Sequence, residues 1–152
     1  MMRFICDVML GKLAKKLRML GIDTSYNNNI TEERLITAAL KENRIVLTRK
    51  TAFPISNKAV PVLFILDNNP KNQLMQTISR LKINKGMINH FSRCISCNKE
   101  LSPLERDLVE GKVADYVFNT TDYFKTCVSC GKIYWPGTHL QNMERLINNI
   151  FI

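Results

Sequence analysis

Four cysteines form the pattern with the most specific chemistry in the sequence. They occur as two CxxC pairs, Cys94 with Cys97 and Cys127 with Cys130. A tight turn presents both sulfurs of such a pair to one tetrahedral ion, at zinc–sulfur distances of about 2.3 Å. The spacing therefore predicts that all four cysteines bind one structural zinc ion. Redox disulfides and buried small hydrophobes are the alternative interpretations.

A second group of candidates lies where predicted strands end and a helix begins. Asp7 follows a strand at 3–6, residues 48–50 (Thr-Arg-Lys) end another, and Glu32 and Glu33 open a helix. In open parallel sheets, sites form beyond the carboxyl ends of the strands. Phosphodiester hydrolysis with Mg²⁺ or Mn²⁺ needs oxygen ligands, usually two or more carboxylates. Asp7 with Glu32 or Glu33 is thus the candidate catalytic set, although first-turn acids also pair with the helix dipole.

Basic side chains close to Asp7 are candidates for holding an anionic strand. Lys12, Lys15 and Lys16 share the face of a predicted helix that is opposite its leucines. Such a stripe can follow a nucleic-acid backbone, and a solvated helix face is the alternative. The predicted nucleic-acid-binding residues are Lys12, Lys15, Lys16, Arg18, Thr48, Arg49 and Lys50.

The net charge of +9 is unevenly distributed along the chain. Residues 1–90 contain 15 Lys and Arg against 6 Asp and Glu, whereas residues 91–152 contain 7 of each. A basic domain attracts polyanions, and nucleic acid is the commonest polyanion in cytoplasm. We therefore expect a nucleic-acid partner for the first part; a solubilising surface without a partner is the alternative.

Cysteine usage and hydropathy indicate the compartment. Four metal-spaced cysteines and one further thiol, Cys6, fit a reducing compartment better than a disulfide scaffold. No apolar run approaches the roughly 18 residues that span a bilayer. Asp7 interrupts the apolar N-terminus, which therefore makes a poor signal peptide. The sequence predicts a soluble cytoplasmic protein without membrane contact.

Strands and helices are predicted to alternate through the first half of the chain. Gly21 is a usual helix stop signal, and Thr31 is a predicted N-cap. This alternation implies βαβ units and a parallel sheet. The predicted elements are strands at 3–6, 22–26, 45–48 and 62–66, helices at 11–20, 32–43 and 70–81, and a loop at 49–61.

The cysteine pairs belong to a second predicted domain. We place the boundary near Phe91, which gives an α/β domain at 1–90 and a zinc module with a final helix at 91–152. The final helix is predicted at 138–150, with Thr138 as its N-cap. His139 and Trp135 are expected to pack or hydrogen-bond between the module and this helix. Tyr134 and Trp135 are expected to pack in the core, and stacking on exposed bases is the alternative use. The neutral module could also dock a protein partner.

Several stretches, taken together, resemble one known family. They are residues 7–14 (DVMLGKLA), 17–24 (LRMLGIDT), 45–49 (IVLTR), 91–98 (FSRCISCN), 127–131 (CVSCG) and 133–139 (IYWPGTH). This series resembles the Mut-seven C-terminal RNase family, in which a PIN-like nuclease domain is fused to a zinc ribbon. The resemblance implies a PIN-like three-layer α/β/α sandwich with a mainly parallel sheet, followed by a C-terminal zinc ribbon and a final helix. It also implies a metal-dependent endoribonuclease site of clustered acids.

The resemblance assigns roles to individual residues. Asp7 occupies the position of the family's first-strand aspartate, a ligand of Mg²⁺ or Mn²⁺, and Asp23 matches the aspartate after the first helix. Lys50 stands where the family has an aspartate directly after Thr-Arg, so a positive charge replaces a negative one. Lys50 could hold a phosphate or stabilise developing charge. Alternatively, it marks a site that has lost its metal and kept only binding.

Three functional hypotheses follow. The first is a metal-dependent ribonuclease in which Asp7 and Glu32 or Glu33 hold the ion that activates water. The second is a non-catalytic RNA-binding protein that kept the fold and the basic surface. The third is a protein-interaction module that acts through the zinc ribbon.

Overall fold

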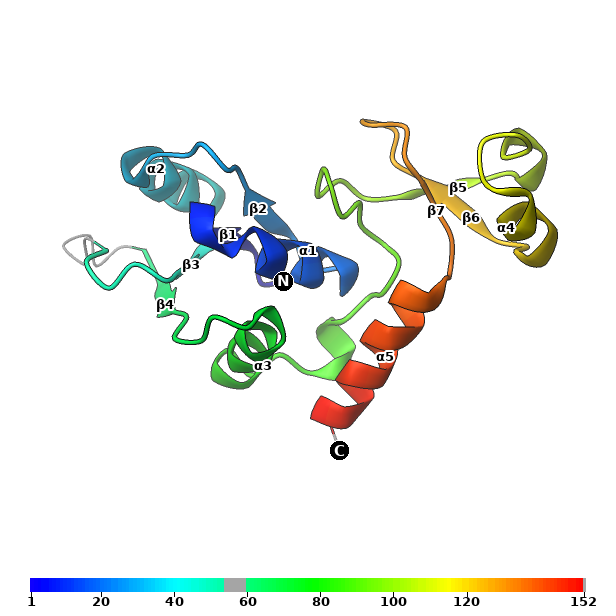
Figure 1. Cartoon of the computed structure of the whole chain (residues 1–152). Coiled ribbons are helices and arrows are strands. Elements are labelled where there is room, and N and C mark those ends of the chain that lie inside the picture. The colour runs from blue at the N-terminus through cyan, green and yellow to red at the C-terminus, as the bar shows by residue number, and fades with distance from the viewer. Residues whose placement is uncertain (54–59, 152) are drawn as a thin grey trace.

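The computed structural model describes residues 1–53 and 60–151 and arranges them in two lobes (Figure 1). One lobe holds a four-stranded parallel sheet and the other a three-stranded antiparallel sheet. Part of the predicted loop at 49–61, namely residues 54–59, lies outside the described residues. Within the described residues, no helix is both long enough and apolar enough to cross a membrane.

The first sheet is built from β1 (Phe4–Cys6), β2 (Thr24–Tyr26), β3 (Ile45–Thr48) and β4 (Val62–Phe64). Its strand order is β2-β1-β3-β4, and each neighbouring pair is parallel. The last residue of β1, Cys6, lies opposite Tyr26 of β2 and Leu47 of β3. Because the strands run in the same direction, their carboxyl ends meet at one edge of the sheet.

Helices cover both faces of this sheet. They are α1 (Gly11–Met19), α2 (Glu32–Glu42) and α3 (Pro70–Arg80). Along β1, Phe4 and Cys6 pack in the core with α1 and α3, whereas Ile5 points to the other face and packs with α2. Leu17 of α1 and Leu74 of α3 are fully buried, and each such burial contributes roughly 1.5–3 kcal/mol. The predicted three-layer α/β/α arrangement with a parallel sheet is confirmed.

The capping residues explain where these helices begin and end. The Thr31 hydroxyl accepts a hydrogen bond from the Arg34 amide at 3.3 Å at the start of α2. Asn43 ends α2 in the left-handed conformation, at φ 53°. At the start of α3, Asn69 caps the first turn and Pro70 occupies the first helical position.

Gly21 allows the connector, residues 82–93 between α3 and the ribbon, to pass close to the end of α1. Its φ is +79°, and a Cβ atom there would lie 2.1 Å from the Asn89 carbonyl oxygen. In the same contact, the Asn89 amide donates a hydrogen bond to the Leu20 carbonyl at 3.0 Å. A side chain at position 21 would separate these segments. Both the positive φ and the close contact with Asn89 therefore require glycine at this position.

The second lobe is an antiparallel ribbon of β5 (Ser102–Leu104), β6 (Phe124–Thr126) and β7 (Ile133–Tyr134), in that order. The excursion between β5 and β6 carries the short helix α4 (Asp115–Thr120) at the far end of the molecule (Figure 1). Val109 and Phe124 are its buried apolar side chains other than cysteine. So small a core contributes little stability by itself.

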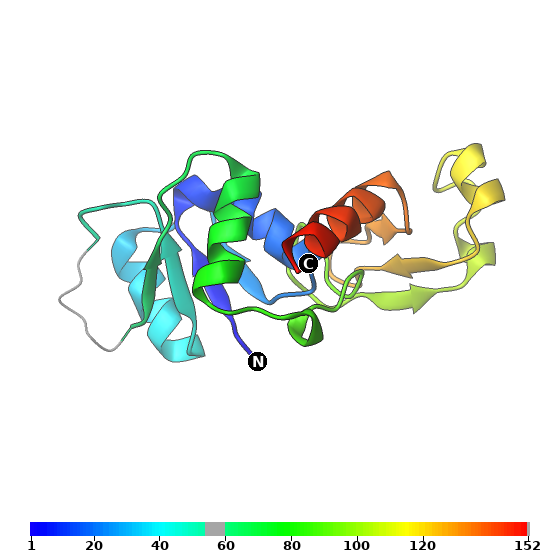
Figure 2. The same cartoon turned by 90° about the horizontal axis from the view of Figure 1, so that it is seen from below.

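The last helix, α5 (Thr138–Ile150), leads back from the ribbon to the first lobe (Figure 2). Met143 and Ile147 are buried in the same core cluster as the leucines of α1. The predicted range of this helix is confirmed, but Gly137 and not Thr138 occupies the N-cap position. The helix assigned to the second domain thus packs on the core of the first.

Asp23 joins several segments at the amino edge of the parallel sheet, opposite the edge that holds Asp7. Its carboxylate accepts hydrogen bonds from the Arg3 Nε at 3.1 Å and from an Arg44 guanidinium nitrogen at 2.6 Å. The side-chain amide of Asn98, in the ribbon lobe, donates to the same carboxylate at 2.7 Å. Arg3, Asp23 and Arg44 each lie directly before a strand, so this network fixes three strand ends and the ribbon together.

The same network changes the pKa of Asp23. Burial by itself would raise the pKa, but the hydrogen bonds from Arg44, Asn98 and Arg3 outweigh it and lower the pKa from 3.8 to about 2. Because the folded-state pKa is the lower one, the stabilisation is fully present above the unfolded-state value. It is lost as the pH falls toward 2.

Replacement of Asp23 by asparagine is expected to lower the free energy of unfolding by about 2 kcal/mol at neutral pH. The difference from the wild type should shrink between about pH 4 and pH 2, since protonation removes the same charge from the wild type. Urea unfolding followed by circular dichroism measures both effects. The exposed Asp122 supplies the control: Asp122→Asn should match the wild type at each pH. A pH-independent difference for Asp23→Asn would contradict the charge argument.

Candidate functional site

Asp7 lies at the topological switch point of the parallel sheet. From β1 the chain leads to β2 on one side, while β3 lies on the other, so the connections diverge between β1 and β3. Asp7 is 2% exposed, and one carboxylate oxygen accepts a hydrogen bond from the Met9 amide at 2.8 Å. The other accepts from the Thr48 hydroxyl at 2.5 Å and the Arg49 amide at 2.8 Å. The carboxylate therefore links the end of β1 to the end of β3.

Lys50 and Glu32 form an ion pair beside this link. The Lys50 Nζ lies 3.1 Å from a Glu32 carboxylate oxygen, and their side chains are 36% and 41% exposed. The Lys50 amide also donates to the Thr48 hydroxyl oxygen at 3.0 Å. Glu33 lies on the same first turn of α2 and is exposed. We call Asp7, residues 48–50 and the first turn of α2 the carboxyl edge.

Arg49 and Asp67 hold the neighbouring strand end. The Arg49 guanidinium donates to the backbone carbonyls of Asp67 and Ile65, just beyond β4. The Asp67 carboxylate accepts from the Asn69 amide at 2.6 Å and from the Asn72 side chain at 3.0 Å, and these bonds lower its pKa. Asp67 thus forms an ordinary turn before α3, and part of the Arg49 hydrogen-bonding capacity is used within the fold.

The basic residues of α1 do not form one surface. Lys12 and Lys15 are exposed and Lys16 is half-buried, but Arg18 is 5% exposed. Arg18 donates to the Thr24 carbonyl at 2.9 Å and to carbonyls of residues 95 and 96 at 2.8 and 3.1 Å. Its burial is at odds with the prediction that Arg18 contacts a nucleic acid. The guanidinium instead anchors the first cysteine pair to the α/β lobe.

The carboxyl edge does not fit the divalent-metal site that the resemblance implies. Within residues 1–53 and 60–151, one group of three or more His, Cys, Asp or Glu residues brings its ligand atoms together, and it is the cysteine group. Asp7 already accepts three hydrogen bonds, Glu32 pairs with Lys50, and Lys50 replaces the third expected acid. Because Mg²⁺ and Mn²⁺ require a shell of oxygen ligands, the carboxyl edge in this arrangement is not a site for either ion.

The four cysteines, in contrast, meet the requirements of a zinc site. The sulfurs of Cys94, Cys97, Cys127 and Cys130 lie within 4.8 Å of one another. Tetrahedral zinc with bonds of about 2.3 Å places its sulfur ligands about 3.8 Å apart. The Cys94 and Cys130 sulfurs are 3.8 Å apart. The set therefore fits one four-coordinate zinc ion, as the spacing predicted.

The two cysteine pairs are held by matching backbone turns. The Cys94 amide donates to the carbonyl of residue 99, and the Cys127 amide donates to the carbonyl of residue 132. Asn98 and Gly131 follow the pairs directly, and both adopt positive φ, at 64° and 74°. Each turn thus bends the chain back so that both sulfurs of a pair point to the same place.

The surroundings of Cys94 favour a metal-binding thiolate. Burial would raise its pKa, but hydrogen bonds from the Tyr134 hydroxyl and from nearby backbone amides outweigh this and lower the pKa to about 7. The Tyr134 hydroxyl lies 3.0 Å from the Cys94 sulfur. Cys6, outside this group, behaves in the opposite way because burial in the apolar core raises its pKa. Cys6 is therefore a core residue, as expected from its apolar neighbours.

Asn98 and Tyr134 are structurally important residues that the sequence did not single out. Asn98 joins the first cysteine turn to both Thr24 and Asp23 through its side chain. A signal for it was present, since Asn98 occupies the place that Gly131 holds after the second pair, and asparagine tolerates positive φ. Tyr134 gave no such signal, because its contact with Cys94 joins positions 40 residues apart.

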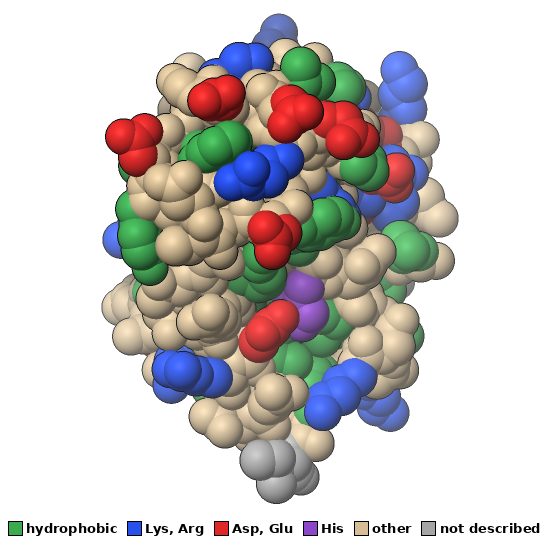
Figure 3. Space-filling model, turned by 90° about the vertical axis from the view of Figure 1, so that its right-hand side faces the viewer, with side chains coloured by type: hydrophobic (Ala, Val, Ile, Leu, Met, Phe, Trp, Pro, Cys, Tyr) green, Lys and Arg blue, Asp and Glu red, His purple; other side chains and the backbone are tan. Residues whose placement is uncertain are grey.

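The surface charge divides the molecule in the way that the sequence predicted. Exposed acids gather on the excursion between β5 and β6, and Figure 3 shows acidic side chains over this end of the molecule. They are Glu105, Asp107, Glu110, Asp115 and Asp122. The exposed lysines of α1 lie on the other lobe. A polyanion is therefore expected to approach the α/β lobe and to avoid the outer end of the ribbon.

The fold and the two sites define a class of protein: a three-layer α/β/α domain joined to a four-cysteine ribbon. The family model described as Mut7-C RNAse domain matches residues 2–147, and the chain therefore belongs to this family. Family membership indicates a ribonuclease-like function. The comparison with curated proteins and the comparison with solved structures each found no match.

Metal analysis of the purified protein is expected to find about one zinc ion per chain. Cys127→Ser should abolish binding and expose the ribbon to proteolysis, because its apolar core is too small to hold it folded. Cys6→Ala supplies the matched control, since Cys6 lies outside the zinc group and this variant should retain zinc. Retention of zinc by Cys127→Ser would contradict the four-thiolate site.

Proposed function

We propose that this protein recognises RNA at the carboxyl edge and holds the strand there by contacts between cations and phosphates. The observation that carries the proposal is the Lys50–Glu32 ion pair, which places a lysine where the family resemblance expects an acid. Membership in an RNase family makes RNA the expected polymer, and the charge of +9 favours a polyanion. Lys50 is therefore the central phosphate contact of the proposed site.

The ion pair does not prevent Lys50 from binding a phosphate. Both side chains are more than one-third exposed, and exposed pairs of this kind contribute about 0.2–1 kcal/mol. A backbone phosphate brings a full negative charge and two non-bridging acceptor oxygens, so it can take the lysine from Glu32 at small cost. Lys12 and Lys15 extend the positive surface along α1 from the same edge.

Hydrolysis of the RNA backbone is the second candidate function. It is favoured by the placement of Asp7 and the first turn of α2 at one edge, together with the family assignment. In this alternative the Lys50–Glu32 pair would have to open, and Asp7 with Glu32 or Glu33 would then hold Mg²⁺ or Mn²⁺, which would supply an activated water molecule. The two functions make opposite demands on Glu32, which competes for Lys50 in the first and binds metal in the second.

Lys50→Gln is expected to weaken binding of single-stranded RNA several-fold and to reduce the slope of log affinity against log salt by about 0.7, the effect of one lost phosphate contact. Glu32→Gln should strengthen binding, because it frees Lys50. Fluorescence anisotropy of a labelled oligoribonucleotide at two salt concentrations measures both. Lys112→Gln, an exposed lysine on the acidic excursion, should leave the affinity unchanged. Equal effects of the two lysine variants would refute a specific role for Lys50.

Cleavage can be followed in the same samples, with Mn²⁺ or with a chelator present. Under the binding proposal, intact RNA is recovered with either addition. Under the hydrolytic alternative, Mn²⁺-dependent products appear, and they disappear with Asp7→Asn and with the double variant Glu32→Gln, Glu33→Gln. Thermal unfolding of Asp7→Asn must accompany this test, because Asp7 also holds two strand ends together. Mn²⁺-dependent products that both variants abolish would reject the purely binding function.

A further inference from the structure

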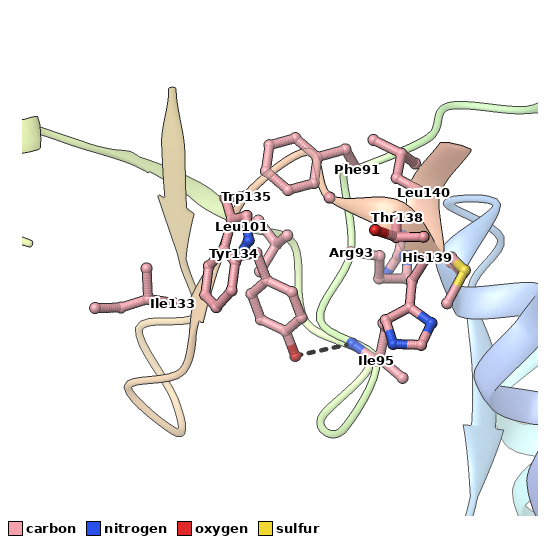
Figure 4. A pocket seen from close by; sticks show the side chains of 12 residues that line it. Phe91, Arg93, Ile95, Leu101, Ile133, Tyr134, Trp135, Thr138, His139 and Leu140 are labelled. Atoms are coloured by element: carbon pink, nitrogen blue, oxygen red, sulfur yellow. Dashed lines mark hydrogen bonds between the residues drawn. The ribbon is translucent and has the colours of Figure 1, made fainter. Parts of the chain in front are cut away.

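A cleft of about 430 Å³ lies away from the carboxyl edge, between the ribbon and the start of α5. Met19 at the end of α1, Phe91 and Arg93 of the connector, and residues 133–135 of the ribbon form its walls. Figure 4 shows the rings of Tyr134 and Trp135 on the ribbon side and His139 on the side of α5. We call it the aromatic cleft.

Two of its aromatic rings are available to a ligand. Trp135 is 36% exposed, which is unusual for so large an apolar side chain. Phe91 is half-buried, and the Lys125 ammonium lies 5.1 Å from the centre of its ring. Tyr134 is different, because its hydroxyl accepts a hydrogen bond from the Ile95 amide at 3.2 Å (Figure 4). Tyr134 thus fixes the wall, while Trp135 and Phe91 present ring surface.

Arg93 brings a positive charge to the wall of the cleft. Its side chain is 12% exposed, donates to the Asn98 carbonyl at 2.7 Å and lies 3.8 Å from a carboxylate oxygen of Glu100. Glu100 is exposed and an ion pair of this length is weak, so the guanidinium can attract a second anion. A ligand that fits the cleft would therefore combine a flat ring with a negative charge close to it.

We propose that the aromatic cleft receives an unpaired base of the bound RNA strand, which stacks on Trp135. A nucleobase has a flat face that can stack on the ring, and the phosphate beside it supplies the negative charge that suits Arg93. Lys125, whose ammonium lies 5.1 Å from the centre of the Phe91 ring, adds a second cation next to the cleft. This inference rests on the proposed function, because it places in the aromatic cleft one base of the RNA strand that the carboxyl edge holds.

Helix α1 runs from the carboxyl edge to the aromatic cleft. It begins just after Asp7 and the following turn, and Met19 at its end lines the cleft. Its nine residues span roughly 14 Å. Lys12 and Lys15 are exposed on this helix between the two ends. A single strand that follows α1 from the carboxyl edge can therefore reach the cleft within a few nucleotides.

Trp135 is the only tryptophan of the chain, so its fluorescence reports directly on the cleft. Titration of the wild-type protein with a short single-stranded oligoribonucleotide should quench this fluorescence. An abasic strand of the same length and charge should not, because it lacks the base that stacks. A perfectly paired RNA duplex should also leave the fluorescence unchanged.

Trp135→Ala should weaken binding of the single strand roughly tenfold, and Trp135→Phe should restore most of the affinity. Tyr116→Ala is the matched control, since Tyr116 is an exposed aromatic residue on α4, outside the cleft. Zinc content and thermal unfolding should be unchanged in all three variants. The wild-type titration needs no variant, so it decides the question even if Trp135→Ala fails to fold.

Quenching by the abasic strand to the same extent, or RNA binding without quenching, would overturn the assignment of a base to the cleft. Wild-type affinity in folded Trp135→Ala would do so as well. If Lys50→Gln weakens binding while Trp135→Ala does not, the inference fails and the proposed function stands. If the protein binds no RNA at low salt, both the proposed function and this inference fail.

Discussion

The contact between Asp23 and Asn98 determines how the two lobes of this molecule fit together. The same carboxylate accepts hydrogen bonds from Arg3 and Arg44, which lie before β1 and β3, so one half-buried charge serves both the sheet and the ribbon. Arg18 supports the contact from α1 through the carbonyls of residues 95 and 96. Because the first cysteine turn is fixed in this way, the four-cysteine group lies at a defined place beside the sheet, and the ribbon extends outward from it.

Asp7, which is buried, and Asp23, which is half-buried, show how two aspartates can serve opposite ends of one sheet. Asp23 lies before β2 and balances two arginines, whereas Asp7 lies after β1 and accepts hydrogen bonds from uncharged donors. Among the described residues, no cation is bonded to the Asp7 carboxylate, which lies beside residues 48–50. Lys50 stands where the resemblance expects a further acid, and its positive charge attracts a phosphate and opposes a metal ion.

Local patterns predicted most of the fold, because strand alternation, helix caps and CxxC spacing act over a few residues. The strand at 45–48, the Thr31 cap and the four-cysteine group are all found as expected. Arg18 was misjudged because its partners lie 77 and 78 residues away, although it follows the buried Ala14 by one helical turn and so shares its inward side. The ion pair between Lys50 and Glu32 could not be foreseen, since it depends on how α2 packs against β3.

The shape of the aromatic cleft depends both on the four-cysteine group and on the packing of α5. Tyr134 connects the ribbon wall of the cleft to the four cysteines, since its hydroxyl contacts the Cys94 sulfur and the Ile95 amide. The other wall is the start of α5, and that helix is held by Met143 and Ile147 in the core of the first lobe. The ribbon forms one wall of the cleft, the start of α5 forms the other, and the α/β lobe adds Met19 and holds α5 in place. The shape of the cleft therefore depends on the contact between the two lobes, because without it the wall formed by α5 would lose its support.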